Sequence, residues 1–270
     1  MENNSLLDVQ HLSHMFHLKR KMTVKAIDDV SFQIKKGEIY GLVGESGSGK
    51  STVARCIMNI YKPSEGEIFY KGIPICKSKE FRKNRKMLQM TRQMIFQDSA
   101  SSLNPRMKIG DIVAEPLRIY SGKGRPGKKE IEKQLELVGL DRSYMEKYPC
   151  ELSGGQRQRV AIARALSTKP ELIVADEPIA SLDVSIQAQM VNLFRKLQKE
   201  QGFSFLFIAH DLSMVEFLCD RTGVMYHGKL VEEGRTKDIF AHPEHEYTKA
   251  LLAAVPIPGP RIERQKGEVL

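Results

Sequence analysis

The sequence contains few cysteines and no long hydrophobic run, and both gaps restrict what the protein can be. Its 270 residues include four cysteines without C-x-x-C spacing, which favours free thiols in a reducing compartment over a disulfide framework. The longest apolar stretch covers residues 203–209, whereas about 20 residues are needed to cross a bilayer. The polar first residues do not resemble a signal peptide. We therefore expect a cytosolic protein that reaches a membrane only through a partner.

Repeated aromatic residues are missing where a nucleic-acid surface would need them. Lysine and arginine number 42 against 33 acidic residues, which gives a net charge of +9 and permits an anionic partner without requiring one. The two basic runs, at 77–86 and 123–129, lack the interleaved aromatic side chains on which successive bases stack. We interpret both runs as solvated faces and expect no nucleic-acid partner.

What the chain does contain is a phosphate-binding loop. Residues 44–52 read GESGSGKST, which fits the pattern G-x-x-x-x-G-K-[ST]. Glycines allow consecutive backbone N–H groups to face an anion, the lysine reaches the terminal phosphates, and the hydroxyl ligates Mg²⁺. Residues 38–43, which are apolar after Glu38, predict a buried strand before the loop, and residues 51–58 predict a helix whose N-terminus faces the phosphates. The loop alone names no function, because kinases, GTPases, helicases and transport ATPases all share it.

Hydrophobic patterning predicts an α/β fold built around this loop. Uniformly apolar residues at 172–175 and 203–209 predict central parallel strands covered on both faces. Helical periodicity at 109–120 and 128–140 predicts a helical lobe inserted at about 98–155. The remaining predictions are antiparallel strands beside the loop at 6–12, 24–34 and 66–70, helices at 156–168, 184–200 and 247–254, and a Pro-rich tail at 256–260.

Polar residues follow several of the predicted strands. Asp176 and Glu177 end an apolar strand, at the edge where open α/β sheets bind ligands. There Asp176 would hold Mg²⁺, and Glu177 would orient and deprotonate an attacking water. His210 follows another apolar strand, where a histidine is either structural or catalytic. Gln97 ends a short apolar segment and, by itself, would be an ordinary surface glutamine.

Together with the sequence LSGGQ at 152–156, these motifs resemble the ATP-binding-cassette (ABC) ATPases in order and spacing, from about residue 6 to residue 234. The resemblance implies a phosphate-loop ABC ATPase core with an antiparallel β subdomain and an inserted helical subdomain. It also implies that ATP and Mg²⁺ are the cofactors. Residues 152–156, the signature segment, would open a helix that faces the γ-phosphate bound to a second subunit. One chain would then contribute half of each of two sites.

The resemblance assigns a role to each matching residue. Glu177 corresponds to the general base, His210 to the γ-phosphate sensor, and Ser51, Gln97 and Asp176 to the Mg²⁺ ligands. Asp183 corresponds to a residue that reaches across the dimer, although it would also serve as a simple helix N-cap. Phe16 stands where the family stacks an aromatic ring on adenine, but it also fits a core position. The remaining nucleotide-binding residues are Gly44, Ser46, Gly47, Ser48, Gly49, Lys50, Ser51 and Thr52 in the loop and Ser153, Gly155 and Gln156 in the signature segment.

A finer resemblance points to the ATPase subunits of oligopeptide, dipeptide and nickel importers. It is carried by residues 97–106, 182–189 and 242–252. It implies an ATPase domain at 1–235 and a C-terminal extension at 236–270. The implied partners are a second ATPase subunit, identical or paralogous, two transmembrane permease subunits and, indirectly, an extracytoplasmic substrate-binding protein. The chain would sit at the cytoplasmic face of the membrane.

Two departures and two alternatives accompany this prediction. No cysteine follows Cys219, so the chain resembles the shorter subunit without a cysteine-rich iron–sulfur tail. Residues 179–181 read IAS where the family commonly has Thr-Ser-Ala. An importer of nickel or another small solute is the first alternative. A soluble nucleic-acid-associated ABC ATPase is the second, and it is disfavoured because the chain lacks the inserted zinc modules, coiled coils or second cassette of those relatives.

Overall fold

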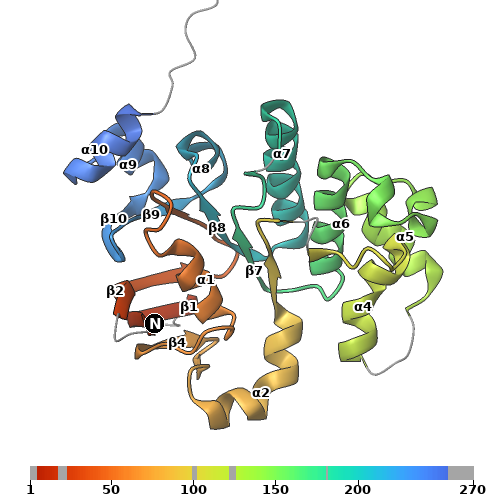
Figure 1. Ribbon diagram of the computed structural model, residues 1–270, viewed down its shortest axis with the longest axis horizontal. Helices are drawn as coiled ribbons and strands as arrows, with labels where there is room; N and C mark the ends of the chain where they lie inside the picture. The colour runs from red at the N-terminus through yellow and green to blue at the C-terminus, as the bar shows by residue number, and fades with distance from the viewer. Residues whose placement is uncertain (1–4, 18–22, 99–101, 122–125, 181, 255–270) are drawn as a thin grey trace, which may run out of the picture.

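The computed structural model describes residues 5–17, 23–98, 102–121, 126–180 and 182–254. A six-stranded sheet in the order β10-β9-β3-β8-β7-β6 forms its centre (Figure 1). All neighbours in it are parallel except β9 and β10. Every residue of β3, β7 and β8 is buried, which confirms the predicted central strands. The strands are β3 (Ile39–Val43), β6 (Arg92–Ile95), β7 (Leu172–Asp176), β8 (Ser204–Ala209), β9 (Arg221–Tyr226) and β10 (Lys229–Arg235).

A second, antiparallel sheet in the order β2-β1-β4-β5 lies beside the first. Its strands are β1 (Ser5–His17), β2 (Thr23–Lys35), β4 (Glu65–Tyr70) and β5 (Ile73–Pro74). Helix α1 (Lys50–Ile57) lies between the two sheets, where its apolar side chains share one core with Leu42 and Ile208 of the central sheet (Figure 1). The predicted antiparallel strands are therefore confirmed, and they cover one face of α1, the helix that follows the phosphate loop.

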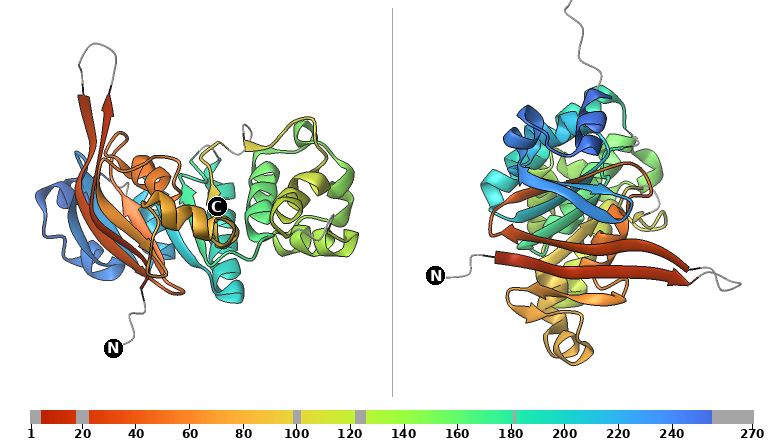
Figure 2. Two further views of the ribbon diagram at one scale, coloured as in Figure 1. Left: turned by 90° about the horizontal axis from the view of Figure 1, so that it is seen from below. Right: turned by 90° about the vertical axis from the view of Figure 1, so that its left-hand side faces the viewer.

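The other face of the central sheet is covered by helices. A second core joins this face to α6 (Gly154–Leu166), α7 (Val184–Gln201) and α8 (Leu212–Leu218). Helices α4 (Ile109–Ser121) and α5 (Lys128–Leu137) extend this layer into a lobe at the end of the molecule opposite β1 and β2 (Figure 2). Short 3-10 turns η1 (Arg142–Glu146) and η2 (Pro149–Glu151) connect the lobe to α6. Helix α5 ends before the predicted residue 140 because Gly139 adopts a left-handed conformation with φ of +72°.

Several elements were not predicted. Helix α2 (Ser78–Thr91) has Leu88 as its single buried residue, so its sequence carries little apolar periodicity. The basic side chains of 77–86 are exposed along it, in agreement with a solvated face. Strands β9 and β10 and helices α9 (Thr236–Ala241) and α10 (Glu246–Ala253) form the C-terminal part, although only α10 was predicted. Ser181, residues 99–101 and 123–125, and the tail at 256–260 lie outside the described residues.

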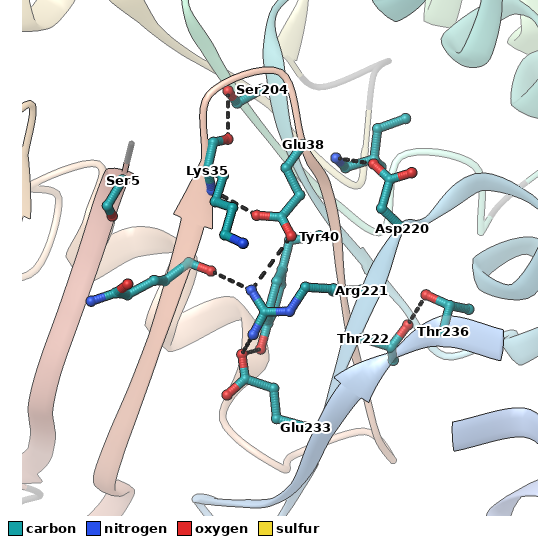
Figure 3. A network of polar contacts seen from close by, with 12 residues as sticks. Ser5, Lys35, Glu38, Tyr40, Ser204, Asp220, Arg221, Thr222, Glu233 and Thr236 are labelled. Atoms are coloured by element: carbon teal, nitrogen blue, oxygen red, sulfur yellow. Dashed lines mark hydrogen bonds and ion pairs between the residues drawn. The ribbon is translucent and has the colours of Figure 1, made fainter. Parts of the chain in front are cut away.

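A polar network fixes the C-terminal strands to the centre of the molecule (Figure 3). Arg221 of β9 pairs with Glu233 of β10 at 2.6 Å and donates to the backbone oxygen of Gln33 in β2 at 3.2 Å. The hydroxyl of Tyr40 in β3 donates to the same Glu233 carboxylate at 3.1 Å. Burial raises the pKa of Glu233, and the neighbouring guanidinium opposes that rise. Four strands are thus joined, and one of them is β3, which leads into the phosphate loop.

Candidate functional site

The phosphate loop follows β3 directly and turns into α1 at the carboxyl edge of the central sheet. Two of its glycines have no room for a side chain. A Cβ on Gly44, whose φ is +146°, would lie 2.1 Å from the backbone oxygen of Met225, and one on Gly49, whose φ is +104°, would lie 2.3 Å from that of Ala26. The loop is therefore pressed against β9 on one side and β2 on the other, in a conformation that requires glycine.

Lys50 fills the inside of this loop. Its side chain is buried, and the ammonium donates to the carbonyl oxygens of Gly44 and Glu45, both at 2.7 Å, and to Ser48 Oγ at 3.2 Å. Burial lowers the pKa of Lys50, while the negative charges of Glu177 and Asp176 act in the opposite direction. A desolvated cation surrounded by turned-in backbone is suited to bind the terminal phosphates of a nucleotide.

An acidic pair at the end of β7 lies beside the loop, as predicted. Asp176 is buried and accepts a 2.7 Å hydrogen bond from Ser51 Oγ, at the start of α1. Burial raises the pKa of Asp176, and the hydrogen bond from Ser51 works against that rise. A hydroxyl, a carboxylate and the nearby side-chain amide of Gln97 are oxygen donors of the kind that Mg²⁺ prefers, so the residues present fit the ion.

Glu177 brings together the side chains that follow three neighbouring strands. Its Oε2 accepts a hydrogen bond from Gln97 Nε2 at 3.0 Å and lies 3.5 Å from His210 Nδ1. The backbone of Glu177 is left-handed, with φ of +46°, and its N–H donates to the carbonyl of Ile208 in β8 at 3.0 Å. The sheet order β6-β7-β8 thus places Gln97, Glu177 and His210 at one edge, where the sequence predicts them.

The signature segment is stabilised by its own helix. Ser153 Oγ accepts from the backbone N–H of Gln156 at 3.3 Å, and the Gln156 side chain accepts from the N–H of Ser153 at 2.9 Å. This reciprocal capping box begins α6. Among the described residues, no hydrogen bond joins the signature segment to the phosphate loop of the same chain.

Gly155 also has a packing role inside its own chain, which the sequence did not indicate. A Cβ at this position would lie 3.0 Å from Cγ2 of Ile186 in α7. The absence of a side chain therefore allows α6 and α7 to approach each other closely. This role is additional to any that the glycine has towards a nucleotide.

The two ambiguous residues differ in how the structure places them. Asp183 stands at the N-cap position of α7, but its exposed side chain makes no capping hydrogen bond within the described residues. The simple N-cap interpretation therefore lacks its defining contact. Phe16 is half-buried near the end of β1 and packs edge-on against His14 and Tyr61, with ring centroids 4.7 and 5.4 Å away. It combines a core contact with partial exposure.

Sequence reasoning missed one side chain that touches the loop. The hydroxyl of Tyr247 in α10 accepts a 2.9 Å hydrogen bond from the backbone N–H of Glu45. The two residues are 202 positions apart. Only the likeness of residues 242–252 to a family motif drew attention to this segment, and that likeness did not indicate the contact.

Comparison with known proteins places these features in a family. Residues 27–180 match the family model described as ABC transporter. The chain belongs to this family. Residues 231–270 of this ABC protein also match the model described as oligopeptide/dipeptide transporter, C-terminal region.

Curated relatives match nearly the whole of this ABC chain. The oligopeptide transport ATP-binding protein OppF of Bacillus subtilis is 52% identical over 269 residues, which cover 97% of this chain and 86% of the relative. The dipeptide transport ATP-binding protein DppF of Lactococcus lactis is 46% identical and covers 100% of this chain, with 87% of its own length matched. Both relatives therefore share the ATPase core and most of the C-terminal extension.

Solved structures agree on the fold. An ATP-binding cassette, solved as a dimer in a post-hydrolysis state bound to ADP and Pi, is 28% identical with a TM-score of 0.76 and covers 85% of this chain and 98% of its own. The protein cbiO1 from Clostridium perfringens, part of an ABC transporter complex, is 29% identical with a TM-score of 0.73 and covers 89% of this chain and 92% of its own. This ABC protein therefore has the ATPase fold of its family, with nucleotide binding implied at the phosphate loop.

Proposed function

We propose that this chain hydrolyses ATP to power the import of oligopeptides or dipeptides through a membrane ABC transporter. The ATPase part rests on one observation: five polar side chains lie together beside a loop that encloses Lys50. They belong to Ser51, Gln97, Asp176, Glu177 and His210. The peptide part is supported by the match of residues 231–270 to the oligopeptide/dipeptide transporter region and by the names of the relatives.

The proposed chemistry uses side chains whose positions are known. Lys50 and the loop amides at 47–52 would bind the phosphates, while Ser51, Gln97 and Asp176 would hold Mg²⁺. Bound Mg²⁺ neutralises the negative charge that develops on the phosphates. Glu177 orients the attacking water and accepts its proton. His210, 3.5 Å from the Glu177 carboxylate, interacts with the γ-phosphate.

Hydrolysis in this proposal requires a second ATPase subunit, identical or paralogous. The N-terminus of α6 carries a partial positive charge and exposes Ser153, so it is suited to the γ-phosphate held by the partner. The side chain of Asp183 makes no capping hydrogen bond within the described residues and is exposed, so it would be available for contact across the same interface. Support comes from the similar cassette that was solved as a dimer with ADP and Pi.

The site is linked physically to a surface on which permease subunits are proposed to bind. A groove of about 920 Å³ between α2, β6 and α4 includes Gln97 and Asp176 in its lining. Phe96 and Ile119 line the same groove and are exposed by 40% and 64% of their surfaces. Within the described part of the chain we find no helix with the length and apolarity that a membrane span requires. Two permease subunits, served by an extracytoplasmic binding protein, would therefore place the chain peripherally at the cytoplasmic face.

The domain boundaries belong to the same proposal. The ATPase domain would occupy residues 1–235, with its helical insertion at about 98–155. The extension at 236–270 would be the part specialised for this transporter class. The family match that begins at residue 231 supports this division.

Reconstitution tests the proposal. The chain would be assembled in vesicles with candidate permease subunits and a second ATPase subunit, with ATP enclosed in the lumen and the binding protein outside. We expect ATP-dependent accumulation of labelled dipeptides or oligopeptides and no accumulation when Glu177→Gln replaces the wild-type chain. ATP hydrolysis without peptide uptake, or uptake of Ni²⁺ in place of peptides, would contradict the peptide assignment while leaving the ATPase intact.

A further inference from the structure

The C-terminal extension contacts the phosphate loop directly. Helix α10 lies with α9 at the end of the central sheet opposite the helical lobe (Figure 1). From there the hydroxyl of Tyr247 accepts the 2.9 Å hydrogen bond from the N–H of Glu45. This N–H lies in the first turn of the loop, before the amides at 47–52 that are assigned to the phosphates. The contact therefore concerns the shape of the loop and not a phosphate directly.

Tyr247 is held firmly in this position. The Glu232 carboxylate of β10 accepts hydrogen bonds from the backbone N–H groups of Glu244 at 2.9 Å and His245 at 3.0 Å. His245 Nδ1 in turn accepts from the N–H of Tyr247 at 3.1 Å, which caps α10. The Tyr247 ring stacks on Tyr226 at the end of β9, with centroids 4.1 Å apart and planes inclined by 28°. The hydroxyl is thus presented by two strands that the Arg221 network fixes to the core (Figure 3).

The bonded N–H belongs to the peptide unit that also contacts Lys50. In the peptide between Gly44 and Glu45, the carbonyl oxygen accepts from Lys50 Nζ at 2.7 Å, and the N–H donates to Tyr247 at 2.9 Å. A trans peptide is planar, so its C=O and N–H point in opposite directions and turn together. Gly44 has the freest backbone of any residue type and cannot fix this plane by itself. Tyr247 therefore restrains, from outside, the peptide that orients Lys50 inside.

We propose that Tyr247 is a positioning residue for ATP binding, acting through the Gly44–Glu45 peptide, and that the C-terminal extension thereby completes the phosphate loop. The inference rests on the proposed ATP binding at this loop. Without the hydroxyl, the loop spends less time in the binding conformation, and apparent affinity falls in proportion to that time. Because the restraint is already present in the free protein, it acts on affinity and leaves the chemical step largely unchanged.

The test compares two tyrosines of one stack in the full-length chain. Tyr247→Phe removes the hydroxyl that Glu45 uses and keeps the ring on Tyr226. Tyr226→Phe is the matched control, because it removes a hydroxyl from the same stack and leaves the Glu45 contact in place. A lost neutral hydrogen bond predicts that Tyr247→Phe raises the Kd and the KM for MgATP by about three- to tenfold. We expect kcat within about twofold of wild type.

A second measurement does not depend on ATP. Hydrogen exchange at the backbone amides of residues 47–50, none of which bonds to Tyr247, should become faster in nucleotide-free Tyr247→Phe and stay unchanged in Tyr226→Phe. Unchanged exchange, or an unchanged Kd and KM, would overturn the proposal. A fall in kcat at constant KM would also overturn it. If the wild-type chain failed to bind ATP, the proposed function would fall, while the exchange data would still decide whether Tyr247 orders the loop.

Discussion

In the proposed mechanism two surfaces of the chain face a nucleotide, the phosphate-loop edge and the signature segment, and they are completed in different ways. At the loop edge, side chains at or just after the ends of β6, β7 and β8 and at the start of α1 contact one another, so Ser51 meets Asp176 and Gln97 meets Glu177. At the signature segment, Ser153 and Gln156 satisfy each other, and no hydrogen bond reaches the loop edge among the described residues. The comparison shows that folding assembles the first surface, whereas the second forms no hydrogen bond to the loop edge within the described part of the chain and, under the proposed function, is completed by another subunit.

The largest effect on the hydrolysis rate is expected for a change that removes only the general base proposed at the loop edge. Replacing Glu177 by glutamine keeps the size of the side chain and an oxygen for the Gln97 amide, but removes the group that accepts the proton. We expect ATP affinity to remain and the hydrolysis rate to fall by about 10²- to 10⁴-fold, the range for losing a positioned general base. Single-turnover kinetics would measure the fall, with Glu171→Gln as a control at a surface ion pair to Lys71. Near-normal hydrolysis by Glu177→Gln would remove Glu177 from the role of base.

The next effect concerns binding at the same edge. Lys50→Ala removes the ammonium that the loop carbonyls hold at 2.7 Å, and with it a charge-assisted contact to the terminal phosphates. We expect the Kd for ATP to rise by about 10- to 100-fold. Calorimetric titration measures this directly, and Lys36→Ala at an exposed position between β2 and β3 is the control. An unchanged Kd would show that the loop does not use Lys50 in this way.

A third prediction breaks the signature segment and spares the loop edge. Ser153→Asp keeps an N-cap oxygen for α6 but places a negative charge where a partner's γ-phosphate would approach. We expect one ATP per monomer to bind as before, while dimer closure fails and hydrolysis falls by about tenfold or more. Ser153→Asn, a neutral N-cap of the same size, is the matched control.

The decisive comparison for Ser153 is the single variant against wild type. Hydrolysis at the wild-type rate by Ser153→Asp would contradict the role in the partner's site. Mixing this variant with Lys50→Ala sharpens the result, because both lesions can fall in one composite site of a mixed dimer and leave the other complete. Activity should then return where the subunits exchange freely and one complete site can turn over alone.

The smallest expected effect separates the two roles of Gly155. Gly155→Ala brings a methyl to within 3.0 Å of Ile186 Cγ2, and such overpacking costs about 1–3 kcal/mol. Alanine is about 0.5–1 kcal/mol more favourable than glycine in a helix, so we expect a net loss of about 1 kcal/mol in unfolding free energy. Ile186→Ala removes the clashing atom, and a double-mutant cycle by denaturant unfolding should show that the paired loss is less than additive. Additive losses would exclude the packing role. If the double variant regains the unfolding free energy but not the hydrolysis rate, Gly155 has a second role, at the proposed dimer interface.

Local patterns explain why much of the site was predictable. The loop glycines, the acidic pair after β7 and the histidine after β8 each follow an apolar strand, and the parallel sheet brings such strand ends together. Helix α2 was missed because its single buried residue leaves no periodic signal. The contacts of Tyr247 with Glu45 and of Gly155 with Ile186 join segments far apart in the sequence, and no local pattern encodes them.

The left-handed backbone of Glu177 limits which residues can replace it during evolution. The conformation costs an ordinary residue about 1–2 kcal/mol, and here the hydrogen bond to Ile208 in the sheet holds it in place. Glycine and asparagine would relieve the cost, but neither carries a carboxylate on a side chain long enough to meet Gln97. Branched residues such as valine would increase it. Replacing Glu177 by glycine or asparagine should therefore raise the free energy of unfolding while removing the carboxylate proposed as the general base, whereas valine at this position should lower it.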